Sequence, residues 1–200
     1  MEITEIRRLK NGRYGLFSAD DFLLSLSGGA LLDSGLAKGD RLEEEQLAHL
    51  RAVVQKEKAK EKAYRLLTGR DHAKGELVRK IARTEGEEAA KEAADAMEKE
   101  GLLDDTAFAD RYADELFGKR LFGKRRVVYE LVHRGINKSL AEEVCAEKDI
   151  APKERALAFL EKKYQHAAED EKARRRAFAG LERAGYDWST AHAAMEDFMA

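Results

Sequence analysis

The sequence predicts a mainly α-helical protein: a tandem array of three three-helix repeats, resembling helix-turn-helix units, preceded by a small N-terminal antiparallel β segment. Three observations lead to this fold class. The 200-residue chain is dominated by helix-favouring residues and has only one proline and fifteen glycines, so few residues break helices. Apolar residues recur at spacings of three and four from about residue 47 onward. A helical segment recurs every 50 residues, marked by Ile81, Leu131 and Leu181.

The first 50 residues predict a short sheet. Residues 3–9 and 13–17 have the composition of two strands, and residues 22–27 predict a third. Asn11-Gly12 favours a type I′ hairpin turn, because both central residues of that turn need a positive φ. A lone hairpin is only marginally stable, so this sheet is expected to pack against another element or to be mobile.

A helix is expected to begin near Leu42, because the acids that follow suit a helix N-terminus. Residues 55–62 then predict a charged linker helix. We divide the chain into the β segment with the start of this helix (1–50) and three repeats (51–104, 105–150 and 151–200). The expected helices are 63–67, 77–83 and 88–98 in the first repeat, 108–117, 127–134 and 139–146 in the second, and 156–164, 177–183 and 189–199 in the third. Units this small bury little alone, so neighbouring repeats should stack.

Several residues are expected at helix ends or in the core. Asn137 and Ser189 are predicted N-caps, Asp104-Asp105 should cap the helix that follows, and Pro152 suits a first turn. The aromatic side chains of the repeats are expected in the core rather than at a ligand: Phe108, Tyr112, Tyr129, Phe159, Tyr164, Phe178, Tyr186 and Trp188.

No catalytic pattern is present. The sequence has neither a phosphate-binding GxxxxGK[ST] loop nor a GxSxG elbow, and its five histidines lack metal-ligand spacing. Cys145 lies in an amphipathic segment and should be buried rather than nucleophilic. We therefore expect a non-enzymatic protein without a cofactor or metal. No apolar run is long enough for a membrane helix and the N-terminus has no signal core, so a cytoplasmic protein is expected. We also expect it to be a monomer.

Charge is segregated along the chain, although the net charge is only −2. Residues 56–83 carry +6, residues 85–115 carry −9, and residues 118–134 carry +5. One interpretation is a set of solvated helix faces that serve solubility. The other is a basic strip for a polyanion or for an acidic groove on a polymer, because basic residues recur between the first and second helices of each repeat. The candidate binding residues are Arg70, Lys74, Arg79, Lys119, Arg120, Lys124, Arg125, Arg126, Arg134, Arg174, Arg175 and Arg176.

One segment is similar to the signature of the RecX family of recombination regulators: residues 100–112, which read EGLLDDTAFADRY. Residues 70–77 (RDHAKGEL) resemble the first-repeat motif of that family, and residues 130–136 (ELVHRGI) resemble the second. Residues 160–164 (LEKKY) and 183–187 (RAGYD) resemble the third. The resemblance covers about residues 57–198. The chain departs from the family pattern at Gly75, where a polar or basic residue is common, and at Thr190-Ala191, where a larger apolar pair is usual.

The resemblance implies a non-enzymatic cytoplasmic regulator of homologous recombination, DNA repair and the SOS response. Its partner would be the filament of the recombinase RecA, with single-stranded DNA contacted weakly or through the filament. Its expected effect is to limit the ATPase, strand-exchange and co-protease activities of RecA. Two other classes stay open: a helix-turn-helix DNA-binding protein acting independently of RecA, and an enzyme with a site assembled from scattered His and Glu residues. The first should show a preferred DNA site, and the second should need a metal or cofactor.

Overall fold

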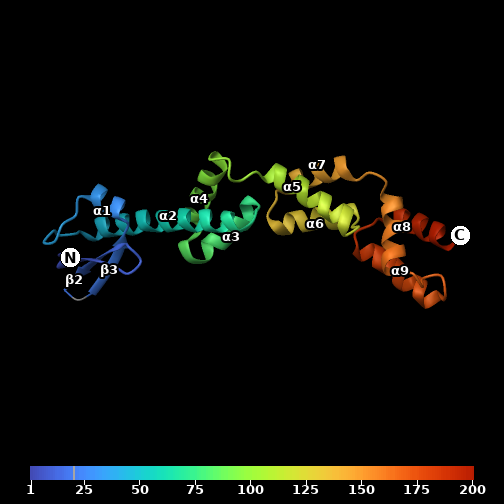
Figure 1. Ribbon diagram of the computed structural model, residues 1–200, viewed down its shortest axis with the longest axis horizontal. Helices are drawn as coiled ribbons and strands as arrows, with labels where there is room; N and C mark the ends of the chain where they lie inside the picture. The colour runs from blue at the N-terminus through green and yellow to red at the C-terminus, as the bar shows by residue number, and fades with distance from the viewer. Residues whose placement is uncertain (20) are drawn as a thin grey trace. The chain divides into compact units, whose positions relative to one another are not determined.

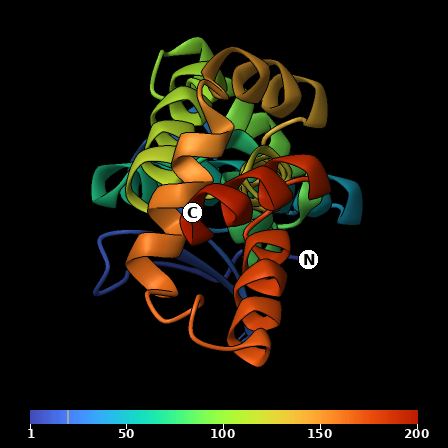
Figure 2. The ribbon, with the colours of Figure 1, turned by 90° about the vertical axis from the view of Figure 1, so that its right-hand side faces the viewer.

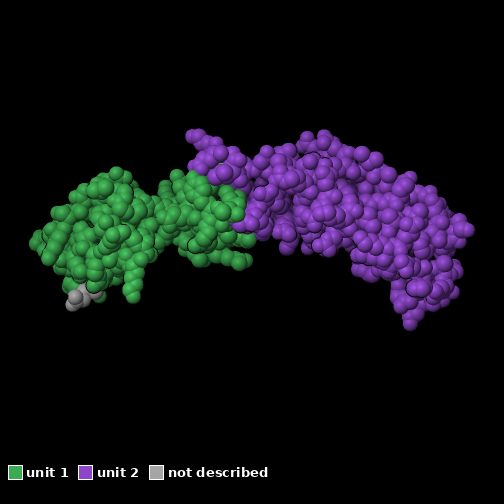
Figure 3. All heavy atoms as spheres, viewed as in Figure 1, with its two compact units in different colours: residues 1–68, 78–97 green, residues 69–77, 98–200 purple. Residues whose placement is uncertain are grey.

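The computed structural model describes residues 1–19 and 21–200. The described part is mostly helical with a three-stranded antiparallel sheet at its N-terminal end, which confirms the predicted fold class (Figure 1). It divides into two compact units: residues 1–68 with 78–97, and residues 69–77 with 98–200 (Figure 3). The four-part division into 1–50, 51–104, 105–150 and 151–200 stays a prediction.

The sheet of unit 1 has the order β1 (Glu5–Arg8), β2 (Tyr14–Ser18) and β3 (Asp21–Leu26), so all three predicted strands are confirmed. The predicted type I′ turn is wrong. Only Gly12 has a positive φ, +80°, and its N–H donates to the carbonyl of Leu9 at 3.0 Å. A second bond, from the Leu9 N–H to the Arg13 carbonyl at 2.7 Å, closes a three-residue loop. One left-handed glycine after a tight turn therefore reverses the chain.

The sheet packs on helix α2 (Glu44–Gly69), which confirms that it does not stand alone. Their shared core holds Ile3, Leu16, Leu24, Leu26, Leu42, Leu47 and Val54. Arg13 links the sheet to this helix, because its guanidinium donates hydrogen bonds to Glu57 at 3.2 Å and to Glu61 at 3.4 Å. The sequence analysis missed the short helix α1 (Gly28–Ser34), which is capped by the Ser27 side chain and ends at Gly35 with a φ of +64°.

Helices α3 (Lys74–Glu85) and α4 (Glu87–Lys99) follow, and their residues 78–97 belong to unit 1. Ile81 of α3 is fully buried. One face of α4 is buried through alanines and Met97, which allows close packing of the helix backbone. Gly86 separates the two helices with a φ of +80°.

The second repeat, in unit 2, consists of α5 (Asp105–Asp114), the π-helical turn η1 (Glu115–Lys119), α6 (Lys124–Arg134) and α7 (Lys138–Lys148). Its core gathers around Val127 and Leu131, both fully buried. The predicted caps Asp104 and Asn137 are confirmed: their side chains accept from the N–H groups of Ala107 and Ser139.

The third repeat consists of α8 (Pro152–Lys163), α9 (Glu171–Arg183) and α10 (Trp188–Met199), which face the viewer in Figure 2. Pro152 occupies the first turn of α8, as predicted. The predicted Ser189 cap is wrong, because Asp187 accepts from the Thr190 N–H instead. Leu181 of α9 is fully buried, so Ile81, Leu131 and Leu181 all lie in the core, each on the second helix of its repeat.

The prediction that the aromatic residues lie in the core is wrong for two of them. Tyr129 is 57% exposed and Trp188 is 63% exposed. Each stacks on a histidine one helical turn later, with ring planes 8° apart for Tyr129–His133 and 12° apart for Trp188–His192. The stacking explains how these rings are ordered on the surface without joining the core.

Candidate partner-binding surface

Helices α9 and α6 meet end to end. The N–H of Gly123 donates to the carbonyl of Ala184 at 2.8 Å, and the N–H of Arg125 donates to the carbonyl of Gly185 at 3.3 Å. The C-terminal carbonyls of α9 thus satisfy N–H groups that would otherwise be unpaired at the start of α6. The backbones of the two segments lie close together, because a Cβ at Gly123 would be 2.5 Å from the backbone of Gly185 and Tyr186.

A second junction has the same form. Gly135, at the C-terminal end of α6, lies against the first turn of α3, where a Cβ at Gly75 would meet the Gly135 carbonyl oxygen at 2.5 Å. Counting from Leu131 and Ile81, Gly75 corresponds to Arg125, the residue that bonds Gly185 in the other junction. This contact explains the departure noted at Gly75: no larger side chain fits there.

Four predicted binding residues are engaged at these junctions. Glu76, only 8% exposed, receives a hydrogen bond from Arg70 at 2.5 Å and lies 3.7 Å from Arg134. Hydrogen bonding with Tyr112 raises the pKa of Arg134, so its charge is secure. Lys74 pairs with Glu98 at 2.6 Å, and Arg126 with Glu130 at 2.6 Å. Arg70, Lys74 and Arg134 are thus paired with carboxylates of other segments, whereas Arg126 pairs one turn along its own helix. All four are poorer candidates for partner binding than cations without an ion pair.

Six other predicted residues are exposed and, in the part of the chain described here, form no ion pair: Lys119, Arg120, Lys124, Arg125, Arg174 and Arg176. Arg175 is exposed and pairs with Glu171 on the same helix, and Arg79 is exposed on α3. The expectation that these basic residues lie between the first and second helices of their repeats is wrong for two clusters. Lys124 and Arg125 lie in the first turn of α6, and Arg174 to Arg176 lie within α9.

Cations in the first turn of a helix oppose the helix dipole. At α6, however, the C-terminal end of α9, which is the negative end of its dipole, lies against the same turn. The bonds to the carbonyls of Ala184 and Gly185 make this contact. The negative end of one helix therefore offsets the positive end of the other. Lys124 and Arg125 are exposed at this junction.

The third repeat shapes the basic segment between η1 and α6. Leu121 has a φ of +56°, a conformation that non-glycine residues rarely adopt. Buried Tyr186 donates to the Leu121 carbonyl at 2.8 Å, and Arg155 donates to the Phe122 carbonyl at 3.0 Å. Sequence analysis named Tyr186 only as a core residue and did not name Arg155. Their partners lie more than 30 positions away, so only the tertiary structure brings them together.

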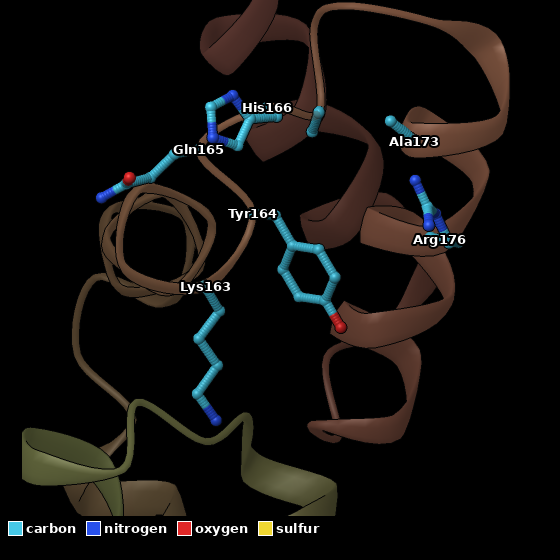
Figure 4. Close-up of a pocket in the computed structure, with 7 residues that line it drawn as sticks. Lys163, Tyr164, Gln165, His166, Ala173 and Arg176 are labelled. Carbon is cyan, nitrogen blue, oxygen red and sulfur yellow. The ribbon is translucent and has the colours of Figure 1, made fainter.

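Arg176 also lines a small pocket between the end of α8 and α9 (Figure 4). Lys163 and His166 line the same pocket, and none of the seven residues that line it is acidic. The Tyr164 ring packs against Gly180 of α9, where the absence of a side chain makes room for it. Lys163 and Arg176 are thus the two lysine or arginine side chains that line the pocket.

Cys145 and the metal-ligating residue types were the other candidates for a reactive site. Burial raises the pKa of the Cys145 thiol to about 11, so it stays protonated, as expected for an inert core cysteine. No three His, Cys, Asp or Glu side chains in the described ranges come together as metal ligands. None of the helices described is both long enough and apolar enough to cross a bilayer.

Known proteins share both sequence and fold with this chain. The family model for RecX, second three-helix domain, matches residues 104–144. The regulatory protein RecX of Chlorobium phaeobacteroides is 30% identical over 132 residues, which cover 65% of this chain and 86% of that protein. The regulatory protein RecX of Clostridioides difficile is 25% identical over 173 residues, covering 85% of this chain and 82% of that protein.

Two solved structures have the same fold. A crystal structure of regulatory protein RecX matches with a TM-score of 0.68, at 21% identity, over 98% of both chains. The crystal structure of RecX from Lactobacillus salivarius matches with a TM-score of 0.63, at 16% identity, over 73% of this chain and 97% of that one. Together with the sequence relatives, the three-helix repeats show that the chain belongs to the RecX family of regulatory proteins.

Proposed function

We propose that this protein binds the RecA filament on single-stranded DNA and inhibits its ATPase, strand-exchange and co-protease activities, with no catalytic reaction of its own. Membership in a family of regulatory proteins supports the regulatory role. The observation that carries the proposal is a set of six exposed cations that form no ion pair among the described residues. Four of them precede or begin α6, and the other two lie on α9.

Unpaired surface cations favour a polyanionic partner. These cations need not break an internal ion pair before they bind. No such loss therefore offsets their attraction to carboxylates or phosphates. A filament repeats the same surface along its length, and tandem repeats can engage several copies at once. Several weak contacts then act together, because the second contact forms at a high effective concentration.

The other DNA-binding interpretation is less well supported. In helix-turn-helix proteins, residues near the N-terminal end of the recognition helix read base edges in the major groove. The N-terminal end of α6 instead lies against Gly185 and Ala184 of the next repeat. Backbone groups at this end of α6 are therefore engaged within the molecule, although the Lys124 and Arg125 side chains are exposed.

A co-sedimentation assay with RecA tests the proposal. The full chain is mixed with RecA in four conditions: with and without single-stranded DNA, each with and without a slowly hydrolysed nucleotide. We expect the chain to pellet only when filaments form, and RecA ATP hydrolysis to fall as the chain is added. Equal binding to DNA with and without RecA, together with a preferred sequence, would instead support an independent DNA-binding protein.

A further inference from the structure

A groove in unit 1 lies between strand β3 and helix α2. Residues 22–25 form its strand side, so the groove follows four consecutive residues of β3. Thr84 and Glu85, at the end of α3, also line the groove, and its volume is about 300 Å³. Its α2 side is one helix face, because the lining residues recur at spacings of three and four: Arg51, Val54, Gln55 and Lys58. A groove between an edge strand and a helix face suits an extended chain.

β3 is an edge strand with one open side. Among the described residues it pairs with β2, in the order β1-β2-β3, and with no other strand. In an antiparallel pair, successive residues alternate between bonding the partner strand and facing away from it. The bond from Leu9 to Arg13 fixes this alternation across the sheet, so Leu24 and Leu26 face β2 and Ser25 faces the open side. The Ser25 carbonyl accepts from the Arg13 guanidinium at 3.1 Å, and in the described structure the Ser25 N–H is left for another extended chain.

The charges around the groove are mainly positive. Arg51 and Lys58 are exposed and form no ion pair among the residues that the structure describes. Glu85 is the acidic residue of the lining, and its carboxylate accepts a hydrogen bond from the Thr84 hydroxyl at 2.7 Å. Lys62 of α2 donates to the same hydroxyl at 2.5 Å, which places a third cation near this carboxylate. The groove therefore attracts an acidic ligand rather than a basic one.

Apolar side chains lie along the strand side of the groove. Phe22 is 56% exposed, and Leu23 next to it is half-buried. We propose that the groove binds an extended acidic segment of a partner protein, which adds to β3 as a fourth strand. Its backbone pairs at Ser25, and its carboxylates lie at Arg51 and Lys58. In strand addition of this kind, main-chain hydrogen bonds give affinity and contacts to alternate side chains give specificity.

This site goes beyond the proposed function. It lies within unit 1, and its lining residues include none of the six exposed cations on which the filament proposal rests. It gives the N-terminal sheet a binding role of its own, directed at a protein segment and not at a nucleic acid. The groove can therefore be tested without RecA.

Selection from a random peptide display library on the immobilised full chain tests the ligand class. We expect the selected peptides to be rich in Asp and Glu that alternate with β-branched residues. A fluorescein-labelled synthetic copy is then titrated by fluorescence anisotropy, and Arg51→Glu/Lys58→Glu should bind it about tenfold more weakly. Lys60→Glu/Arg65→Glu is the matched control, because it reverses two exposed α2 cations that do not line the groove. Far-UV circular dichroism shows that each variant is folded.

Hydrogen exchange at the Ser25 amide tests strand addition itself. This amide faces the open side of β3, so it should exchange rapidly in the free chain and slowly with the selected peptide bound. Peptides N-methylated at alternate residues give a second readout. One alternate set should abolish binding and the other should not, because only every second amide of an added strand bonds to β3.

Each result decides one part of the inference. Peptides without an acidic consensus, or equal binding by the two double variants, would show that the groove is not an acidic-ligand site. Unchanged exchange at Ser25 on peptide binding would contradict strand addition. Either failure leaves the filament proposal standing, since RecA takes no part in these measurements. A chain that binds the acidic peptide at β3 but is not captured by RecA filaments would support the groove and contradict the filament proposal.

Discussion

The hydroxyl of Tyr186 donates a hydrogen bond to the backbone carbonyl of Leu121, 2.8 Å away and 65 residues earlier in the chain. Tyr186 is only 2% exposed, and burial raises its pKa to about 12, so the hydroxyl keeps its proton. Leu121 has a φ of +56° and begins the turn between η1 and α6, beside Lys119 and Arg120. One buried side chain of the third repeat thus holds the basic segment of the second in an otherwise unfavourable conformation.

Replacing Tyr186 with Phe tests this link. The variant keeps the ring in the core and removes the bond to Leu121 together with the hydroxyl's interaction with Arg155, so the free energy of unfolding should fall by about 1 kcal/mol. Urea denaturation followed by circular dichroism measures the change. Tyr164→Phe is the control: the Tyr164 hydroxyl lies against Gly180 and has no hydrogen-bond partner among the described residues, so its loss should cost less. Equal effects in the two variants would contradict the role given to Tyr186.

The α9–α6 junction predicts that alanine substitution destabilises the protein at Gly123 but not at Gly118, five residues earlier. Gly123 has a φ of −79°, which alanine adopts freely, but its Cβ would stand 2.5 Å from the Gly185 backbone. We expect Gly123→Ala to destabilise the protein by about 1–3 kcal/mol, because the backbones must move apart. Gly118→Ala meets nothing within 4 Å and should be neutral or slightly stabilising. Thermal unfolding of both variants checks this, and a stable Gly123→Ala protein would show that the junction is loose.

Burial of Cys145 predicts a pH dependence of stability. Its pKa is raised from 9.0 to about 11 in the folded protein, so above pH 9 the unfolded chain loses this proton before the folded chain does. The free energy of unfolding should therefore fall as pH rises from 9 to 11, by at most about 1.4 kcal/mol per pH unit from this group, and should not depend on it below pH 8. The measurement is urea unfolding of the wild type and Cys145→Ala across pH 7–11. The two proteins should differ in slope only above pH 9, and parallel curves would show that the thiol is accessible.

The sequence predicted the fold well at positions whose residue type strongly prefers one structural environment. Ile81, Leu131 and Leu181 are apolar, recur at a constant spacing and are buried on the second helices. Pro152 and Asn137 have narrow preferences for helix starts, and both predictions are confirmed. The hairpin turn was predicted less well, because Asn-Gly suits several turn types and the choice depends on strand twist and register.

Other features depend on contacts between distant residues. Asp187 and Ser189 are both residue types that favour N-caps, and in the structure Asp187 takes the role by accepting from the Thr190 N–H. Tyr129 and Trp188 have the apolar character of core residues, but both lie on helix faces that no neighbouring element covers in unit 2. The candidate site was predicted as a set of basic residues. The sequence could not separate those that bind within the molecule, such as Arg134, from those left exposed, such as Arg125, because ion pairs across junctions follow from the stacking of repeats.

The central claim is that exposed cations without an internal ion pair bind the RecA filament. The most direct measurement is co-sedimentation of Lys119→Glu/Arg120→Glu with RecA filaments on single-stranded DNA at low salt. Arg8→Glu/Lys10→Glu is the matched control, because it reverses two exposed cations of unit 1 that also form no ion pair in the described structure. The account predicts that the first variant binds about tenfold more weakly, with a smaller salt dependence, and that the control binds like the wild type. Wild-type affinity in the first variant, or an equal loss in both, would contradict it.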